Sequence, residues 1–165
     1  MSGTFRPVVF FSVFALLLPG VHAQSPLAPV PSPLLSAQKV FLANGGADPV
    51  SIEAFRKAAQ VNEPYTSFYD ALQSWGHWQL VSSPADADLV LVVRFTAPLA
   101  PGPSYSPQVE VKLVDGKTRF PLWTLTQPVE GAFRRTTWTR NYNDGIAALI
   151  GQLKTLTAPP GSATP

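Results

Sequence analysis

The stretch ADADLVLVVRFT, residues 85–96, contains the feature that decides the predicted fold. From Leu89 to Val93, five aliphatic residues follow one another with no polar residue between them. Successive side chains of a strand point to opposite faces, so a strand covered on one face only alternates apolar with polar residues. The unbroken run therefore predicts a central strand that is apolar on both faces. Helices on both faces of the sheet would account for it.

The other strands are predicted from short apolar or alternating runs bounded by turn residues. The NGG at residues 44–46 predicts a turn with positive φ that ends the first strand. The DGKT at residues 115–118 predicts a hairpin between two antiparallel strands. The predicted strands are residues 39–43, 78–81, 89–96, 109–113 and 119–129.

Two helices are predicted from apolar residues at helical spacing, and residues 48–61 show a weaker helical pattern. The first helix, residues 65–75, follows Asn62 as a cap and Pro64 in the first turn. Its aromatic stripe is typical of a face packed on a sheet, and a ligand-binding cage is the alternative. The second helix begins at residues 136–137. The two apolar sets are Tyr65, Phe68, Tyr69, Leu72 and Trp75, and then Trp138, Tyr142, Ile146, Leu149, Ile150 and Leu153.

These elements predict one α+β domain with a mixed sheet of about five strands, in the order β-α-β-β-β-β-α, and two or three helices packed on it. Residues 89–96 are expected at the centre, parallel to residues 39–43 and joined to them by a right-handed crossover. The last three strands are expected to form an antiparallel meander.

The two ends of the chain predict export and flexible flanks. Residues 1–23 resemble a secretory signal peptide, with Arg6 before an apolar segment and a small-x-small cleavage site at residues 21–23. An uncleaved membrane anchor is the alternative. Residues 24–36 predict a proline-rich disordered leader, residues 37–157 the folded domain, and residues 158–165 a disordered tail. After cleavage, no remaining segment predicts a transmembrane helix, which indicates a periplasmic or secreted protein.

The composition narrows the classes of partner and chemistry. The 165 residues contain no cysteine, which excludes disulfides, thiol catalysis and a lipid-anchoring cysteine. Without Arg6, 11 Lys and Arg remain against 10 Asp and Glu, and this balance does not support a nucleic-acid partner. Only 13% of the residues are charged, about half of the usual ~25%, so much of the surface is neutral.

No motif predicts a catalytic, cofactor or metal site. The glycines at residues 44–46 lack the pattern of a phosphate-binding loop. Asp86 and Asp88 could suggest calcium, but a turn or capping role is favoured because no further oxygen ligands follow them. His77, the only histidine after the signal peptide, is interpreted as turn or surface packing. Hydrolase signatures are missing, so we expect no enzyme, no cofactor and no metal.

One local cluster of cations suggests an anion-binding site. Arg134 and Arg135 directly precede the last predicted helix, and Arg140 follows within it. The N-terminus of a helix attracts anions, so these arginines and free backbone amides could bind phosphate, a carboxylate or an acidic envelope polymer. The alternative is that they are solvated and pair with Glu130 or Asp144.

The order of elements, with KVFLANGG at residues 39–46 and LWTLT at residues 122–126, resembles a group of small exported bacterial proteins of unknown function. More distantly, the chain is similar to the N-terminal domain of TolB and to curli-secretion and penicillin-binding-protein-activator lipoprotein domains. The resemblance implies an envelope interaction module rather than an enzyme, and no catalytic residue carries over.

The sequence thus favours an exported, non-catalytic interaction module whose partner is an envelope protein or polymer. The second hypothesis is a binder of a small anion or acidic polymer through Arg134, Arg135 and Arg140. The third is an unrecognised hydrolase. The specific partner and the oligomeric state stay open.

If the anion-site hypothesis holds, replacing both Arg134 and Arg135 with Gln should abolish salt-sensitive retention on an anionic matrix, because two cations are removed from the helix N-terminus. Elution from such a column across a salt gradient measures the effect. Unchanged retention would exclude the anion site.

Overall fold

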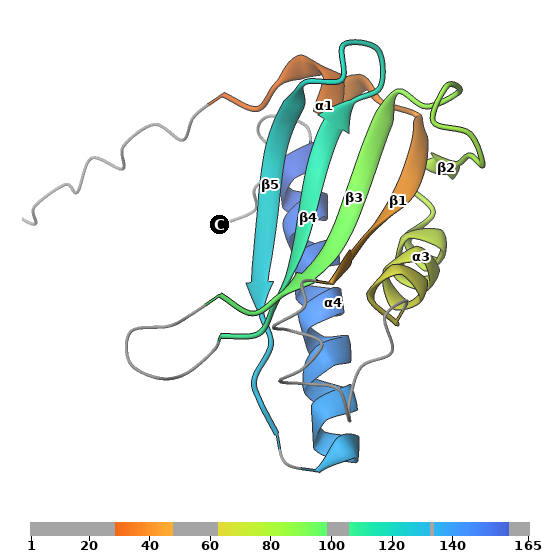
Figure 1. Cartoon of the computed structure of the whole chain (residues 1–165). Coiled ribbons are helices and arrows are strands. Elements are labelled where there is room, and N and C mark those ends of the chain that lie inside the picture. Colours follow the sequence, from red (N-terminus) through yellow and green to blue (C-terminus); the bar gives the residue numbers. More distant parts are fainter. Residues whose placement is uncertain (1–28, 48–62, 99–105, 133, 159–165) are drawn as a thin grey trace, which may run out of the picture.

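A five-stranded mixed sheet forms the centre of the molecule (Figure 1). The computed structural model describes residues 29–47, 63–98, 106–132 and 134–158. Within these ranges the order of strands across the sheet is β2-β1-β3-β4-β5, which confirms the predicted α+β class. The strands are β1 (Lys39–Ala47), β2 (Gln79–Leu80), β3 (Leu89–Thr96), β4 (Gln108–Asp115) and β5 (Pro121–Pro128).

The pairing of the strands also follows the prediction. β3 lies in the middle of the sheet and runs parallel to β1, with Phe41 paired to Val90. β1 is also parallel to the short β2, whereas β3, β4 and β5 form an antiparallel meander. In the sheet, β2 therefore lies on one side of β1 and β3 lies on the other side, although β2 precedes β3 in the chain.

Among the described residues, three helices pack on one face of this sheet: α1 (Ser32–Ser36), α3 (Glu63–Trp75) and α4 (Arg135–Thr157). Figure 1 shows α4 crossing behind the strands, and α3 contacts α4, β1 and β3. One hydrophobic core lies between this face and the helices. Its largest fully buried side chains include Phe68 from α3, Trp138 and Tyr142 from α4, Leu34 from α1, and Leu89, Leu91, Val93 and Phe95 from β3.

The prediction of helices on both faces is wrong for the described residues. Leu89, Leu91 and Val93 point into the core, but Val90 and Val92 lie on the opposite face, which no described helix covers. Val90 is only 8% exposed although it lies outside the core cluster, because apolar neighbours on β1 and β4 flank it. An unbroken apolar run in a strand thus indicates apolar neighbours on both faces of the sheet. It does not require a helix on each face.

The N-terminal boundary of the packed domain also differs from the prediction. Ser32–Ser36 forms α1, with Pro33 in its first turn, and Leu34 is 1% exposed in the core. The segment predicted as a leader therefore contributes to the hydrophobic core. The predicted signal peptide, the start of the leader, the weak helix of residues 48–61 and nearly all of the predicted tail lie outside the described residues. None of the helices in the described ranges combines the length and hydropathy of a membrane span.

β1 does not end at the predicted glycine turn. The strand continues to Ala47 through an irregularity in its pairing with β3. Gly46 adopts a φ of 71°, as predicted for this stretch, and Gly45 lies so close to β3 that an added Cβ would be 2.9 Å from the carbonyl oxygen of Val93. The glycines therefore permit a bulge and a close strand contact.

The hairpin between β4 and β5 packs directly on the turn that precedes β3. The backbone N–H of Gly116 donates a hydrogen bond of 2.8 Å to the carbonyl of Asp88. A Cβ at position 116 would lie 2.0 Å from the carbonyl oxygen of Ala87. Only a residue without a side chain fits here unless the two turns separate.

We expect Gly116→Ala to lower the free energy of unfolding by about 1–3 kcal/mol, because the added methyl group forces two hydrogen-bonded turns apart. Chemical denaturation measures the change. Gly131→Ala is the matched control, since a Cβ at Gly131 has no atom within 4 Å. Equal stability of the two variants would contradict the close contact.

Candidate functional site

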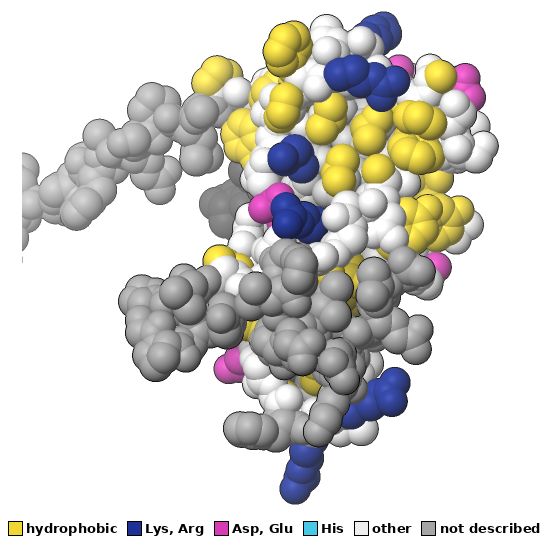
Figure 2. Space-filling model, viewed as in Figure 1, with side chains coloured by type: hydrophobic (Ala, Val, Ile, Leu, Met, Phe, Trp, Pro, Cys, Tyr) yellow, Lys and Arg dark blue, Asp and Glu magenta, His cyan; other side chains and the backbone are white. Residues whose placement is uncertain are grey.

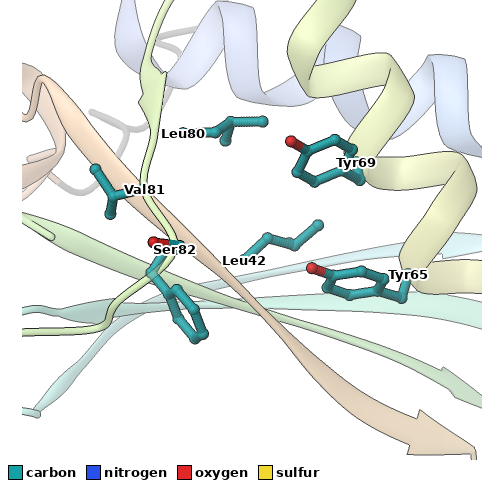
Figure 3. Close-up of a pocket in the computed structure, with 7 residues that line it drawn as sticks. Leu42, Tyr65, Tyr69, Leu80, Val81 and Ser82 are labelled. Carbon is teal, nitrogen blue, oxygen red and sulfur yellow. The ribbon is translucent and has the colours of Figure 1, made fainter.

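A cavity of about 530 Å³ lies between α3 and the edge of the sheet formed by β1 and β2 (Figure 3). The described residues that line it are all uncharged. The apolar part comes from the strands, and Tyr65 and Tyr69 project from α3 with their hydroxyl groups toward the strands. The lining residues are Phe41, Leu42, Tyr65, Tyr69, Leu80, Val81 and Ser82.

The aromatic stripe predicted on α3 divides between the core and this cavity. Phe68 and Leu72 are buried in the core, as expected for a face packed on a sheet. Tyr65 and Tyr69 stay half-buried, and their rings stack with centroids 6.3 Å apart. The sequence could not separate these roles because all of these residues share one helical spacing. The presence of a hydroxyl group on only two of them was the available signal.

The face of the sheet that no described helix covers is the second candidate site, and we call it the outer face. The strand registers arrange its side chains in rows that cross the sheet, and the rows change from apolar to charged along the strands. The rows are Phe41, Val90, Val114 and Pro121; then Ala43, Val92, Lys112 and Thr124; then Arg94, Glu110 and Thr126.

The apolar part of the outer face lies among cations. Figure 2 looks onto this face and shows hydrophobic side chains gathered in its upper half, with Lys and Arg side chains between them. Lys39, Arg94 and Lys112 are exposed on the strands, against the single carboxylate of Glu110. The outer face therefore combines a flat apolar area with a positive charge.

Asp88 has a structural role at the start of β1. Its Oδ2 atom accepts hydrogen bonds from the backbone N–H groups of Gln38 (3.0 Å) and Lys39 (2.9 Å). These donors, that of Gln38 first, hold the pKa of Asp88 below its ordinary value. Within the described ranges no group of three or more His, Cys, Asp or Glu side chains is placed to hold a metal ion. The favoured capping role is confirmed, although the capped segment is β1.

His77 packs in the turn after α3, as the sequence predicted. Its ring stacks on Trp75 with a centroid distance of 4.7 Å, and Trp78 lies 5.4 Å away. Lys154 of α4 lies over the same Trp75 ring, with Nζ 5.9 Å from its centroid. These contacts join the end of α3 to α4.

The three arginines of the predicted anion site lie at the start of α4. Arg134 is the N-cap residue, Arg135 is the first helical residue and Arg140 lies farther along, all of them exposed. The carbonyl of Arg134 accepts the N–H of Trp138 at 3.0 Å. Arg135 and Arg140 are five residues apart, so they point to different sides of the helix. The anion site stays a prediction.

The comparisons with known proteins show a likeness of fold. No protein-family model matches the chain, and no curated protein matches it at a significant level. A DUF4136 family protein from Bacteroides thetaiotaomicron is similar to it in structure, with a TM-score of 0.52 and 14% sequence identity over 75% of this chain and 91% of that one.

Two further bacterial structures are similar at lower scores. A DUF330 protein from Xanthomonas campestris has a TM-score of 0.46 and 14% identity, over 73% of this chain and 83% of that one. A PelC dodecamer from Paraburkholderia phytofirmans also has a TM-score of 0.46 and 14% sequence identity, over 70% of this chain and 86% of that one. The predicted resemblance to small bacterial proteins is supported at the level of fold, and the likeness to TolB and to the lipoprotein domains stays a prediction.

The hydrogen bonds of Asp88 predict a pH-dependent loss of stability. Because its folded pKa lies below the ordinary 3.8, the charged carboxylate stabilises the fold above that pH, and this contribution disappears as the pH falls through the folded pKa. We expect Asp88→Asn to melt at a lower temperature than the wild type near neutral pH, with the difference shrinking below pH 3.8. Asp86→Asn, in the same turn, is the control. A pH-independent difference would contradict the role of the charge.

Proposed function

We propose that this chain is an exported, non-catalytic interaction module that binds another protein through its outer face. The observation that carries the proposal is the apolar first row of the outer face, extended by Ala43 and Val92 of the second row, where no described helix covers the sheet. Val90 and its neighbours form a continuous apolar area at the centre of the sheet, where strand pairing holds the backbone rigid. Its half-buried members, Phe41, Val92 and Val114, still expose apolar surface, and covering that surface removes it from water, which favours association.

The charges around the apolar rows define the partner. Lys39 and Arg94 border the apolar residues, Lys112 lies beside Val92 in the second row, and Glu110 is the one carboxylate among the strand residues of this face. A complementary protein surface would present apolar side chains bordered by Asp and Glu. Complementary potentials steer the encounter and select against wrong partners.

A second copy of the chain and a membrane fit this face less well. Two outer faces packed on each other would bring like charges together, which costs free energy. A bilayer requires apolar side chains that project into it, whereas Val90 is 8% exposed between its neighbours and Val92 is half-buried. A shaped, acidic protein surface therefore suits the outer face best.

The non-catalytic part of the proposal is supported by the contacts of three titratable side chains, which stabilise the fold. Asp88 accepts backbone hydrogen bonds, Asp115 accepts three from Lys117 and Thr118, and His77 stacks on Trp75. The described residues that line the cavity beside α3 are uncharged. The signal peptide predicted for residues 1–23 supports an envelope or extracellular location.

We expect Val92→Glu to abolish partner binding, because it places a carboxylate among the apolar rows and next to an acidic surface. Val92 is half-buried on an uncovered face, so the variant should fold with a native circular-dichroism spectrum. Binding is measured in the producing cell with a photo-crosslinking residue in place of Thr124, which is exposed in the second row. Gln73→Glu, on the exposed side of α3, is the matched control.

Zero-length carbodiimide crosslinking tests the charge of the partner directly, because it joins Lys to Asp or Glu in contact. Mass spectrometry should find Lys112 or Lys39 joined to carboxylates of one other protein, the same one that Thr124 captures, while Lys154 on α4 stays unlinked. Links to a second copy, capture of lipid alone, or an adduct that survives Val92→Glu would each overturn the proposal.

A further inference from the structure

The cavity beside α3 lies where the pairing of β2 with β1 stops. β2 pairs with β1 only at Lys39 and Val40, and the N–H of Val81 donates the last hydrogen bond, 2.9 Å, to the carbonyl of Val40. The chain then turns away, since the N–H of Asp86 bonds the carbonyl of Ser83 at 3.2 Å. In the described part of the chain, no strand pairs with this edge of β1 beyond Val40.

The backbone geometry of a parallel strand sets what this edge can bind. In a parallel strand, the backbone N–H and C=O of one residue point toward the same neighbouring strand, and those of the next residue point toward the opposite neighbour. Val40 faces β2, so Leu42 faces the same edge, at the floor of the cavity. A segment lying there in extended conformation would place alternate side chains toward α3.

The lining of the cavity matches such a segment. Its floor and sides are apolar, and the hydroxyl groups of Tyr65 and Tyr69 point inward over the edge, where each hydroxyl group is able to donate and accept (Figure 3). None of the described lining residues carries a charge, so among them a charged ligand would lose hydration without a counter-charge. The chemistry of the walls therefore suits an apolar side chain flanked by uncharged amide groups.

We propose that this cavity takes an apolar side chain of an extended, uncharged peptide segment that pairs with β1 in the place where β2 stops. This is recognition by strand addition, in which backbone hydrogen bonds give affinity and a side-chain cavity gives specificity. Phe41 lines the cavity and also begins the first row of the outer face, so the two surfaces adjoin. The peptide site is nonetheless separate from the apolar rows centred on Val90 and Val92.

The probe is the blocked pentapeptide acetyl-Thr-Leu-Thr-Leu-Thr-amide, titrated into isotope-labelled protein and followed by NMR. We expect chemical-shift changes at Leu42, Tyr65, Tyr69 and Ser82, and slower hydrogen exchange of the Leu42 amide, which strand pairing alone would cause. Tyr69→Phe should weaken binding by about three- to tenfold, the loss of one hydrogen bond. A pentapeptide with Glu in place of both Leu residues should not bind.

Two substitutions make the result decisive. Ser82→Trp fills the cavity from an exposed position and should abolish the shifts, whereas Gln73→Trp, on the exposed side of α3, should leave them unchanged. Val92→Glu should bind the peptide normally, which separates this site from the outer face. No shifts at millimolar peptide, shifts that persist in Ser82→Trp, or the same shifts with maltose in place of the peptide would overturn the proposal.

Discussion

The hydrogen bonds of Asp88 hold together the three segments on which the sheet depends. Its side chain accepts the N–H groups of Gln38 and Lys39, its own N–H donates to the carbonyl of Lys39, and its carbonyl accepts the N–H of Gly116. Hydrogen bonds to Asp88 therefore join the start of β1, the start of β3 and the hairpin after β4. Asp88 is 50 and 49 residues away from Gln38 and Lys39 in the sequence, so hydrogen bonds between residues close in sequence cannot make this connection.

The sheet could be predicted from the sequence because each strand carries its own pattern, and β3 carries the strongest one. The position of the helices could not, since an apolar side chain such as Val90 has the same appearance under a helix or between apolar cross-strand neighbours. Leu34 was assigned to a leader because prolines surround it, yet Pro33 suits the first turn of a short helix. These sequence patterns depend on neighbouring residues only. Whether Val90 and Leu34 are buried depends on residues that are distant in the sequence.

The candidate sites were harder to predict for the same reason. Tyr65 and Tyr69 share their helical spacing with Phe68, and only the end of the β2 pairing leaves space above them. The outer face exists because two strands far apart in sequence bring Phe41 and Val114 to either side of Val90. The arginines at the start of α4 were visible in the sequence as a cluster, but the helix directs Arg135 and Arg140 to different sides.

One-sided coverage of the sheet also separates two kinds of evolutionary constraint. Along β3, Leu91 and Val93 are fixed by the packing of α3 and α4, whereas Val92 and Arg94 between them face away from that core. The two sets of positions therefore meet different demands: one must fit the core, and the other must suit the outer surface. Substitution of every second residue of the central strand changes the outer face of the sheet while the residues packed in the core stay the same.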